Sequence, residues 1–229
     1  MTFLIDPPVN DAEAKDVLAV AYSEVFHDFA NDQNVFPDGF PNLFALGVAQ
    51  AIGFMEGGPY GKWGPAGKSN NWGALTRAPN SDGSCPANSF THNDSKFDDE
   101  AGAVVTYSTC FRKYDTSLEG AKDFLTRLYV DRPETFEFAL GGDIRGVAED
   151  MYATRYYLGT APATATDENG DFVNVNNYIE FIGRGVNQIA HLYPGFSPDE
   201  HAPERGKSNT GLILGVTAAA LVGLVVAFN

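Results

Sequence analysis

An uncharged stretch near the C-terminal end constrains this chain more than any other feature. Between Gly211 and Phe228 no side chain carries a charge, and Thr217 supplies the one polar side chain. As an α-helix this stretch spans roughly 27 Å, close to the ~30 Å hydrocarbon core of a bilayer. A helix of this length in a soluble protein normally has a polar stripe, and this stretch has none. We therefore predict a single transmembrane helix over residues 211–228, with the lipid bilayer as a partner.

The residues on either side of the folded part suggest how the chain is organised. Residues 194–210 are rich in Pro, Gly and charge, which is typical of a linker. Arg205 and Lys207 come just before the apolar stretch, so the positive-inside rule places the N-terminal bulk on the cytoplasmic side. Residues 1–10 lack the basic start and apolar run of a secretory signal. We expect a folded domain over 1–193, a linker over 194–210 and a membrane helix over 211–228.

The charge balance excludes whole classes of function. The chain has 30 Asp and Glu against 15 Lys and Arg, a formal net charge of −15, and 44% hydrophobic residues. Phosphate binding relies on clustered Lys and Arg, so most nucleic-acid roles are excluded. Loose electrostatic attachment to anionic lipid or to a polyanionic wall is disfavoured for the same reason. The apolar content is sufficient for one sizeable core.

Hydrophobic periodicity predicts a mainly helical domain with one β-hairpin lobe, an α+β fold. Helices are expected over residues 11–30, 42–56, 117–130 and 175–193, with shorter ones over 133–139 and 144–154. Strands over 89–92 and 103–114 flank a polar, acidic turn, which favours an antiparallel hairpin. The Gly-rich segment 57–67 argues against regular structure, and 164–176 is expected to be a surface hairpin or loop.

Two cysteines and four histidines give little sign of a metal site. A hairpin would bring Cys85 and Cys110 together, and a disulfide there would stabilise the fold by roughly 3 kcal/mol. The alternative is two unpaired, half-buried thiols. The histidines (His27, His92, His191 and His201) have no metal-ligand spacing, and the calcium-loop pattern that starts at Asp167 fails at Phe172 and Tyr178. We expect no metal and no cofactor.

Glu56 is the carboxylate that stands out. It follows Ile52 by four residues, so it lies at the edge of the apolar face of the predicted second helix. A carboxyl group at the end of a packed helix is partly desolvated, which raises its pKa. A raised pKa is what a general acid needs near neutral pH. The alternative is a solvated Glu at a helix end.

Three segments in the same order resemble the lysozyme-like superfamily. They are Glu56 with the Tyr60-Gly61-Lys62 and Ser69-Asn70-Asn71-Trp72-Gly73 runs, the segment 111–128 (FRKYDTSLEGAKDFLTRL) and the segment 151–160 (MYATRYYLGT). The similarity is greatest to the bacterial and phage β-N-acetylglucosaminidases of the flagellar and autolysin type. It spans about residues 43–160, perhaps half of the chain. The resemblance implies a lysozyme-like fold and a glycoside hydrolase activity on peptidoglycan.

The resemblance also implies a site. Glu56 corresponds to the general acid, and the sugar-binding candidates are Tyr60, Ser69, Asn70, Asn71, Trp72, Tyr152, Tyr156 and Tyr157. Asn side chains can hydrogen-bond to N-acetyl and hydroxyl groups, and aromatic rings can pack on the apolar face of a pyranose. For Trp72, packing in the core is an equally good interpretation.

A second carboxylate is left open. The resemblance places one, where it exists, near the hairpin, where Asp94, Asp98, Asp99 and Glu100 are candidates and Glu100 or Asp99 is favoured. All four also suit a solvated turn. If the N-acetyl group of the substrate assists the reaction, Glu56 alone is sufficient.

The sequence therefore predicts a peptidoglycan hydrolase that cleaves the β-1,4 glycan with Glu56 as general acid. Because peptidoglycan lies outside the cytoplasmic membrane, we expect a phage virion to carry the enzyme to the bacterial envelope for wall penetration. Alternatives are a lytic transglycosylase or muramidase acting in the same cleft, and a cellular tail-anchored autolysin. A further alternative is a catalytically inactive, membrane-anchored structural protein with virion or membrane protein partners.

Overall fold

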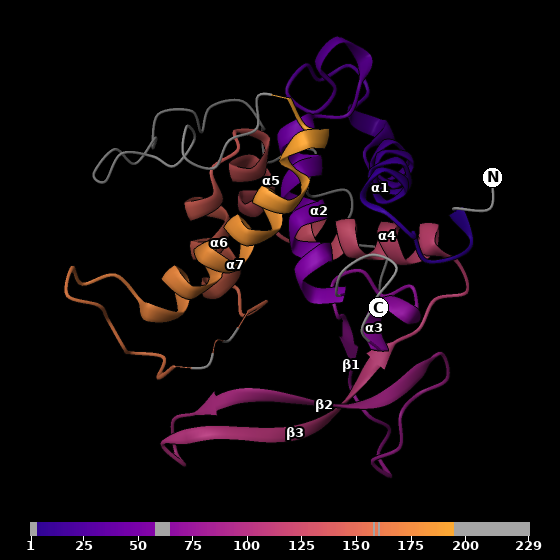
Figure 1. Ribbon diagram of the computed structural model, residues 1–229. Coiled ribbons are helices and arrows are strands. Elements are labelled where there is room, and N and C mark those ends of the chain that lie inside the picture. Colours follow the sequence, from indigo (N-terminus) through magenta and orange to yellow (C-terminus); the bar gives the residue numbers. More distant parts are fainter. Residues whose placement is uncertain (1–3, 58–64, 158, 160, 195–229) are drawn as a thin grey trace.

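The computed structural model describes residues 4–57, 65–157, 159 and 161–194 (Figure 1). The helices gather at one end of the molecule and a small sheet lies at the other, so the described part has an α+β architecture. The α-helices are α1 (Asp11–Val25), α2 (Leu43–Gly57), α3 (Pro65–Lys68), α4 (Ser117–Leu125), α5 (Pro133–Leu140), α6 (Ile144–Ala153) and α7 (Val173–Ile189). A single π-helical turn, Thr126–Val130, continues α4.

Helix α2 is the centre of the core. Nearly all of its first eleven residues are buried, and it packs against α1, α5 and α7. Gly185 of α7 allows a close crossing, because a Cβ atom at this position would lie 2.6 Å from the carbonyl oxygen of Ala51. The mainly apolar sequence of α2 thus forms a buried axis, and its C-terminal end carries Glu56.

Side-chain caps explain where the helices begin. The Oδ1 atom of Asn42 accepts hydrogen bonds from the backbone N–H groups of Phe44 and Ala45, at 2.9 and 3.1 Å. Thr116 and Glu119 form a reciprocal capping box at the start of α4. The predicted helix starts near 42 and 117 are confirmed.

Helix ends differ more from the predictions. The first helix was expected to reach residue 30, but α1 ends at Val25 and a short 3₁₀ turn, His27–Phe29, follows. The last helix begins at Val173, inside the segment predicted as a hairpin or loop, of which one isolated bridge between Thr166 and Phe172 remains. Within the Gly-rich segment, the prediction of no regular structure is wrong for Pro65–Lys68, which forms α3.

The sheet contains the predicted hairpin and one further strand. Strands β1 (Thr76–Arg77), β2 (Ser89–Asp98) and β3 (Ala103–Arg112) are antiparallel in the order β1-β3-β2. The strand β2 extends to Asp98 through residues predicted as a turn, because an antiparallel sheet tolerates polar side chains on a face that meets water. The disulfide between Cys85 and Cys110 is present, which decides between the two alternatives for these cysteines.

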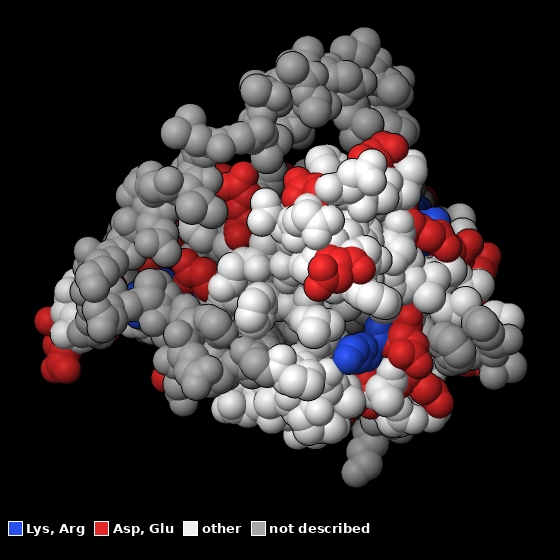
Figure 2. All heavy atoms as spheres, turned by 90° about the horizontal axis from the view of Figure 1, so that it is seen from above, with Lys and Arg blue, Asp and Glu red and all other residues white. Residues whose placement is uncertain are grey.

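The surface of the described part is acidic. On the face shown in Figure 2, Asp and Glu side chains predominate over Lys and Arg, in keeping with the net charge of −15. Among the described residues, none of the helices combines the length and the apolar character needed to cross a bilayer. The predicted linker, from residue 195 on, and the predicted membrane helix at 211–228 lie outside the described residues.

Candidate active site

Glu56 lies in the last turn of α2 and is half-buried. Its Oε1 atom accepts a hydrogen bond of 3.5 Å from the hydroxyl group of Tyr178 on α7. Tyr178 belongs to the buried face of α7, which repeats at helical spacing through Val175, Tyr178, Ile182 and Gly185. The packing of α7 on α2 therefore brings a phenol group to the carboxylate.

Three tyrosines surround this carboxylate, and we call Tyr156, Tyr157 and Tyr178 the tyrosine cluster. The rings of Tyr157 and Tyr178 stack with centroids 4.2 Å apart. Burial raises the pKa of all three hydroxyl groups, and the negative charge of Glu56 raises the pKa of each further. Below about pH 10 the cluster therefore consists of neutral phenols that can donate hydrogen bonds.

Tyr156 connects the cluster to the segment that follows α3. Its hydroxyl group donates to the carbonyl oxygen of Gly73 at 3.3 Å, and the Arg132 guanidinium lies over its ring, 4.9 Å from the centroid. A Cβ atom at residue 73 would lie 2.6 Å from the Tyr156 hydroxyl oxygen and 2.5 Å from Cδ2 of Phe124. Only glycine at this position permits such a close approach.

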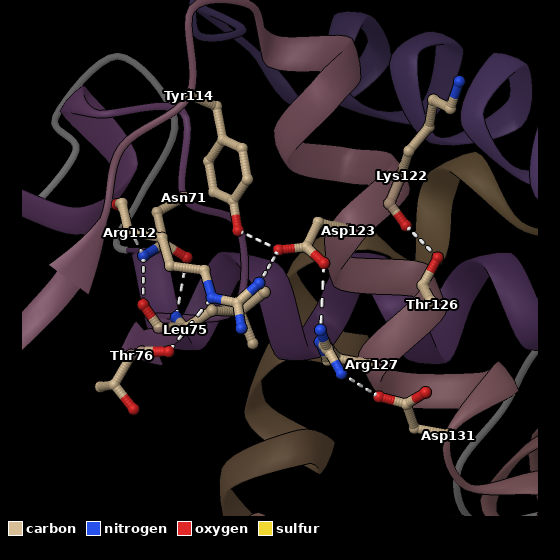
Figure 3. Close-up of polar contacts among 10 residues, drawn as sticks. All are labelled: Asn71, Leu75, Thr76, Arg112, Tyr114, Lys122, Asp123, Thr126, Arg127 and Asp131. Atoms are coloured by element: carbon tan, nitrogen blue, oxygen red, sulfur yellow. Dashed lines mark hydrogen bonds and ion pairs between the residues drawn. The ribbon is translucent and has the colours of Figure 1, made fainter. Parts of the chain in front are cut away.

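Residues 69–75, which we call the 69–75 loop, contain the Asn and Trp candidates. Asn71 is fully buried, and its side chain exchanges hydrogen bonds with the backbone of Leu75 and donates to the carbonyl oxygen of Arg112 (Figure 3). Trp72 is 1% exposed and donates from Nε1 to the carbonyl oxygen of Ser117. Both side chains therefore stabilise the loop from within the core. The sugar contact of Asn71 stays a prediction, and the burial of Trp72 favours its packing interpretation.

The remaining sugar-binding candidates have different surroundings. Asn70 is almost buried and donates from Nδ2 to the carbonyl oxygens of Ile5 and Tyr114, whereas Ser69 is half-buried. Tyr152 is half-buried and donates to the carbonyl oxygen of Ala163 at 3.1 Å. Tyr60 lies outside the described residues. Of the predicted residues, the structure brings Tyr156 and Tyr157 to Glu56.

Of the four candidates for a second carboxylate, Asp98, Asp99 and Glu100 lie at the tip of the hairpin, whereas Asp94 lies within β2, opposite Tyr107. Asp98 accepts from the N–H group of Ala101 at 2.8 Å, and Asp99 accepts from that of Ala163 at 3.3 Å. Asp99 and Glu100 are exposed, and the side chain of Asp94 is not among those described. Among the described carboxylates, only the charge of Glu56 contributes to the raised pKa values of the tyrosine cluster.

Tyr178, which bonds to Glu56, is a candidate site residue that the sequence does not predict. Its only signal was its place on the apolar face of the last predicted helix, where a tyrosine is indistinguishable from any other core residue. In the described part of the chain, no three His, Cys, Asp or Glu side chains are grouped so that they would bind a metal ion.

The fold is similar to those of three solved hydrolase structures. A mutant of a peptidoglycan hydrolase from Sphingomonas sp. A1 is 18% identical, with a TM-score of 0.45, and covers 80% of this chain and 99% of its own. The catalytic domain of the autolysin Auto from Listeria monocytogenes is 14% identical, with a TM-score of 0.44 and coverages of 80% and 86%. A C-terminally truncated glycoside hydrolase domain of FlgJ from Salmonella typhimurium is 15% identical, with a TM-score of 0.39 and coverages of 78% and 98%.

The amino-acid sequence by itself gives no such match to a known family or protein. No protein-family model matches the sequence, and no curated protein matches it.

Proposed function

We propose that this protein is a peptidoglycan hydrolase that cleaves the β-1,4 glycan strand with Glu56 as general acid. The observation that carries the proposal is the half-buried Glu56 carboxyl group at the end of a core helix, beside three phenol groups whose raised pKa values keep them neutral. A carboxyl group is the side chain that most often donates a proton to a glycosidic oxygen.

The tyrosine cluster suits an N-acetylated sugar. Tyr157 is half-buried, so part of this residue is exposed. Tyrosine combines a flat apolar face, which packs on a pyranose, with a hydroxyl group that donates to an acetamido oxygen. The cluster thus offers packing and hydrogen bonding within reach of the proton donor.

Among the carboxylates that the structure describes, Glu56 is the one coupled to this cluster, which favours a substrate-assisted route. The acetamido oxygen of the substrate attacks C1 while the C1–O bond breaks, and the leaving oxygen takes the proton of Glu56. Water then attacks C1 of the oxazolinium ion, which reopens the ring to the acetamido group, and gives a proton to the Glu56 carboxylate. In the lytic transglycosylase alternative, the C6 hydroxyl of N-acetylmuramic acid attacks instead of water and gives a 1,6-anhydro sugar. In the muramidase alternative, the enzyme cleaves the same strand after N-acetylmuramic acid.

Membrane anchoring through residues 211–228 and delivery by a virion are the remaining parts of the proposal. The disulfide supports action outside the cytoplasm, since disulfides persist in oxidising compartments. An acidic surface provides no electrostatic attraction to the wall. A membrane tether instead raises the local concentration of the enzyme near the wall. Protease treatment of intact virions or cells, followed by immunoblotting for residues 1–193, tests on which side of the membrane the domain lies.

Clearing of purified peptidoglycan by the full chain tests the activity. We expect the unchanged protein to clear the wall and Glu56→Gln to lose about 100-fold or more of the rate, the loss typical of a removed general acid. Glu180→Gln changes an exposed residue of α7 and serves as the matched control, with activity retained. Clearing by Glu56→Gln at the rate of the control contradicts the assignment. A folded but inactive unchanged protein favours the structural alternative.

A further inference from the structure

A compact ion-pair cluster lies where the hairpin meets α4 (Figure 3). The Oδ2 atom of Asp123 on α4 accepts hydrogen bonds from both the Arg112 guanidinium, at the end of β3, and the Tyr114 hydroxyl group. The other oxygen of Asp123 lies 3.6 Å from Nε of Arg127. The side chains of Arg112 and Asp123 are 18% and 22% exposed, so this ion pair is largely shielded from water.

The charges in this cluster are mutually stabilised. Burial alone would lower the pKa of Arg112, but the Asp123 carboxylate and Tyr114 raise it by more, so the pKa of Arg112 is raised. Burial, and next the hydrogen bond to Asp123, raise the pKa of Tyr114. Asp123 therefore faces two permanent cations, Arg112 and Arg127, and one neutral phenol donor. Removing its charge leaves the partly buried Arg112 without its counter-charge.

The two residues that Asp123 holds also bond to the 69–75 loop. The backbone of Arg112 donates to the carbonyl oxygen of Leu75 at 2.9 Å and accepts from the Asn71 side chain at 3.1 Å. The backbone of Tyr114 donates to the carbonyl oxygen of Ser69 at 3.0 Å and accepts from the Asn70 side chain at 3.2 Å. Both ends of the loop are thus bonded to the strand-to-helix connection that Asp123 fixes.

The 69–75 loop in turn touches both parts of the candidate active site. The carbonyl oxygen of Gly73 accepts a hydrogen bond from the hydroxyl group of Tyr156, a member of the tyrosine cluster. Trp72 packs under α2 at Gly53, three residues before Glu56, where a Cβ atom would lie 3.3 Å from Cε3 of the indole. A shift of the loop therefore moves the support of Tyr156 and of the end of α2.

We propose that Asp123 is a positioning residue for the active site, acting through Arg112, Tyr114 and the 69–75 loop on Tyr156 and Glu56. This inference rests on the proposed hydrolase function. Asp123 holds the loop that supports the proton donor and takes no part in the bond cleavage itself. Its geometry depends on one carboxylate oxygen accepting two donors, an arrangement that a charged carboxylate supports better than an amide.

Amide hydrogen exchange and kinetics of full-length Asp123→Asn test this inference. We expect faster exchange confined to the amides of residues 69–75, 112 and 114. We also expect kcat to fall by about tenfold with KM nearly unchanged, because a small misplacement of a catalytic group lowers the rate steeply. Asp131→Asn is the matched control, since Asp131 pairs with Arg127 at 2.5 Å at the more exposed end of the same network.

A second variant keeps the test decisive if Asp123→Asn folds poorly. Tyr114→Phe removes one donor and leaves the Arg112 ion pair, so smaller changes in exchange and in kcat, of the same sign, are expected. Exchange at the level of the control, or faster exchange with unchanged kcat, overturns the positioning role. Should the unchanged protein cleave no peptidoglycan, the proposed function fails, whereas the exchange data still show whether Asp123 holds the loop.

Discussion

Tyr178 donates a hydrogen bond of 3.5 Å to Glu56, although 122 residues separate them in the sequence. The contact depends on the packing of α7 on α2, where Gly185 lets the two backbones approach. The last helix of the domain therefore completes the surroundings of a carboxylate on the second helix.

Tyr178→Phe tests the contribution of this hydroxyl group. The variant keeps the stack with Tyr157 but removes the hydrogen bond to Glu56, so we expect kcat to fall by about two- to tenfold, in line with a weak hydrogen bond. Tyr193→Phe, which removes a buried hydroxyl bonded to Gln50, is the control. Steady-state kinetics on soluble glycan fragments give the comparison. Equal kcat values for the two variants would show that the Tyr178 hydroxyl does not assist Glu56.

Gly73→Ala tests the close contact beneath Tyr156. The new methyl group would lie within 2.6 Å of Phe124 and Tyr156, so we expect the free energy of unfolding to fall by about 1–3 kcal/mol. Gly183→Ala on α7 meets no atom within 4 Å and should raise it by about 0.5–1 kcal/mol through helix propensity. Urea unfolding of both variants measures the difference. An unchanged free energy of unfolding in Gly73→Ala would contradict the close contact of residue 73 with Phe124 and Tyr156.

The stability should fall at high pH. The pKa values of Tyr129, Tyr156, Tyr178 and Tyr193 are raised well above 10.0, chiefly by burial. Above about pH 10 the unfolded chain therefore releases protons that the folded protein retains, and the free energy of unfolding decreases as the pH rises. Unfolding in urea between pH 8 and 11 should show this decline, with a shallower slope in Tyr178→Phe. A stability that stays constant up to pH 11 is incompatible with these buried hydroxyls.

Reduction of the disulfide tests how far the hairpin lobe depends on it. Cys85 and Cys110 are 25 residues apart, so the chain-entropy model gives a loss of roughly 3.5 kcal/mol in the free energy of unfolding without the bridge. The double variant Cys85→Ser/Cys110→Ser, compared with the oxidised protein, measures it. A loss below about 1 kcal/mol would mean that the lobe is held by its other contacts, because the entropic term is then offset.

Much of the helical framework was predictable from local sequence. Caps at Asn42 and Thr116 and the apolar face of α2 determine where helices start and which face is buried. The end of α1 at Val25 and the extension of β2 to Asp98 were not predictable from local sequence. Both depend on tertiary packing and strand pairing, which no local window of sequence contains.

The site was predicted in part for the same reason. The sequence predicts Glu56, Tyr156 and Tyr157 as site residues, and in the structure the charge of Glu56 acts on both tyrosines. The side chains of Asn71 and Trp72 are of types that also bind sugars, so the sequence does not distinguish the two roles. The fold shows that both side chains lie in the core and hydrogen-bond to backbone atoms. The local sequence does not indicate that Arg112, Tyr114 and Asp123 contact one another. The structure shows that one carboxylate oxygen of Asp123 accepts hydrogen bonds from both Arg112 and Tyr114.

Mass spectrometry of the fragments released from purified peptidoglycan tests the central claim most directly. We predict glycan fragments with N-acetylglucosamine at their reducing ends from the unchanged protein and from Glu180→Gln, and none from Glu56→Gln. Ends in N-acetylmuramic acid or its 1,6-anhydro form would keep Glu56 as the acid and change the bond or the route. Unaltered fragments from Glu56→Gln, or no glycan cleavage by the folded protein, would contradict the account.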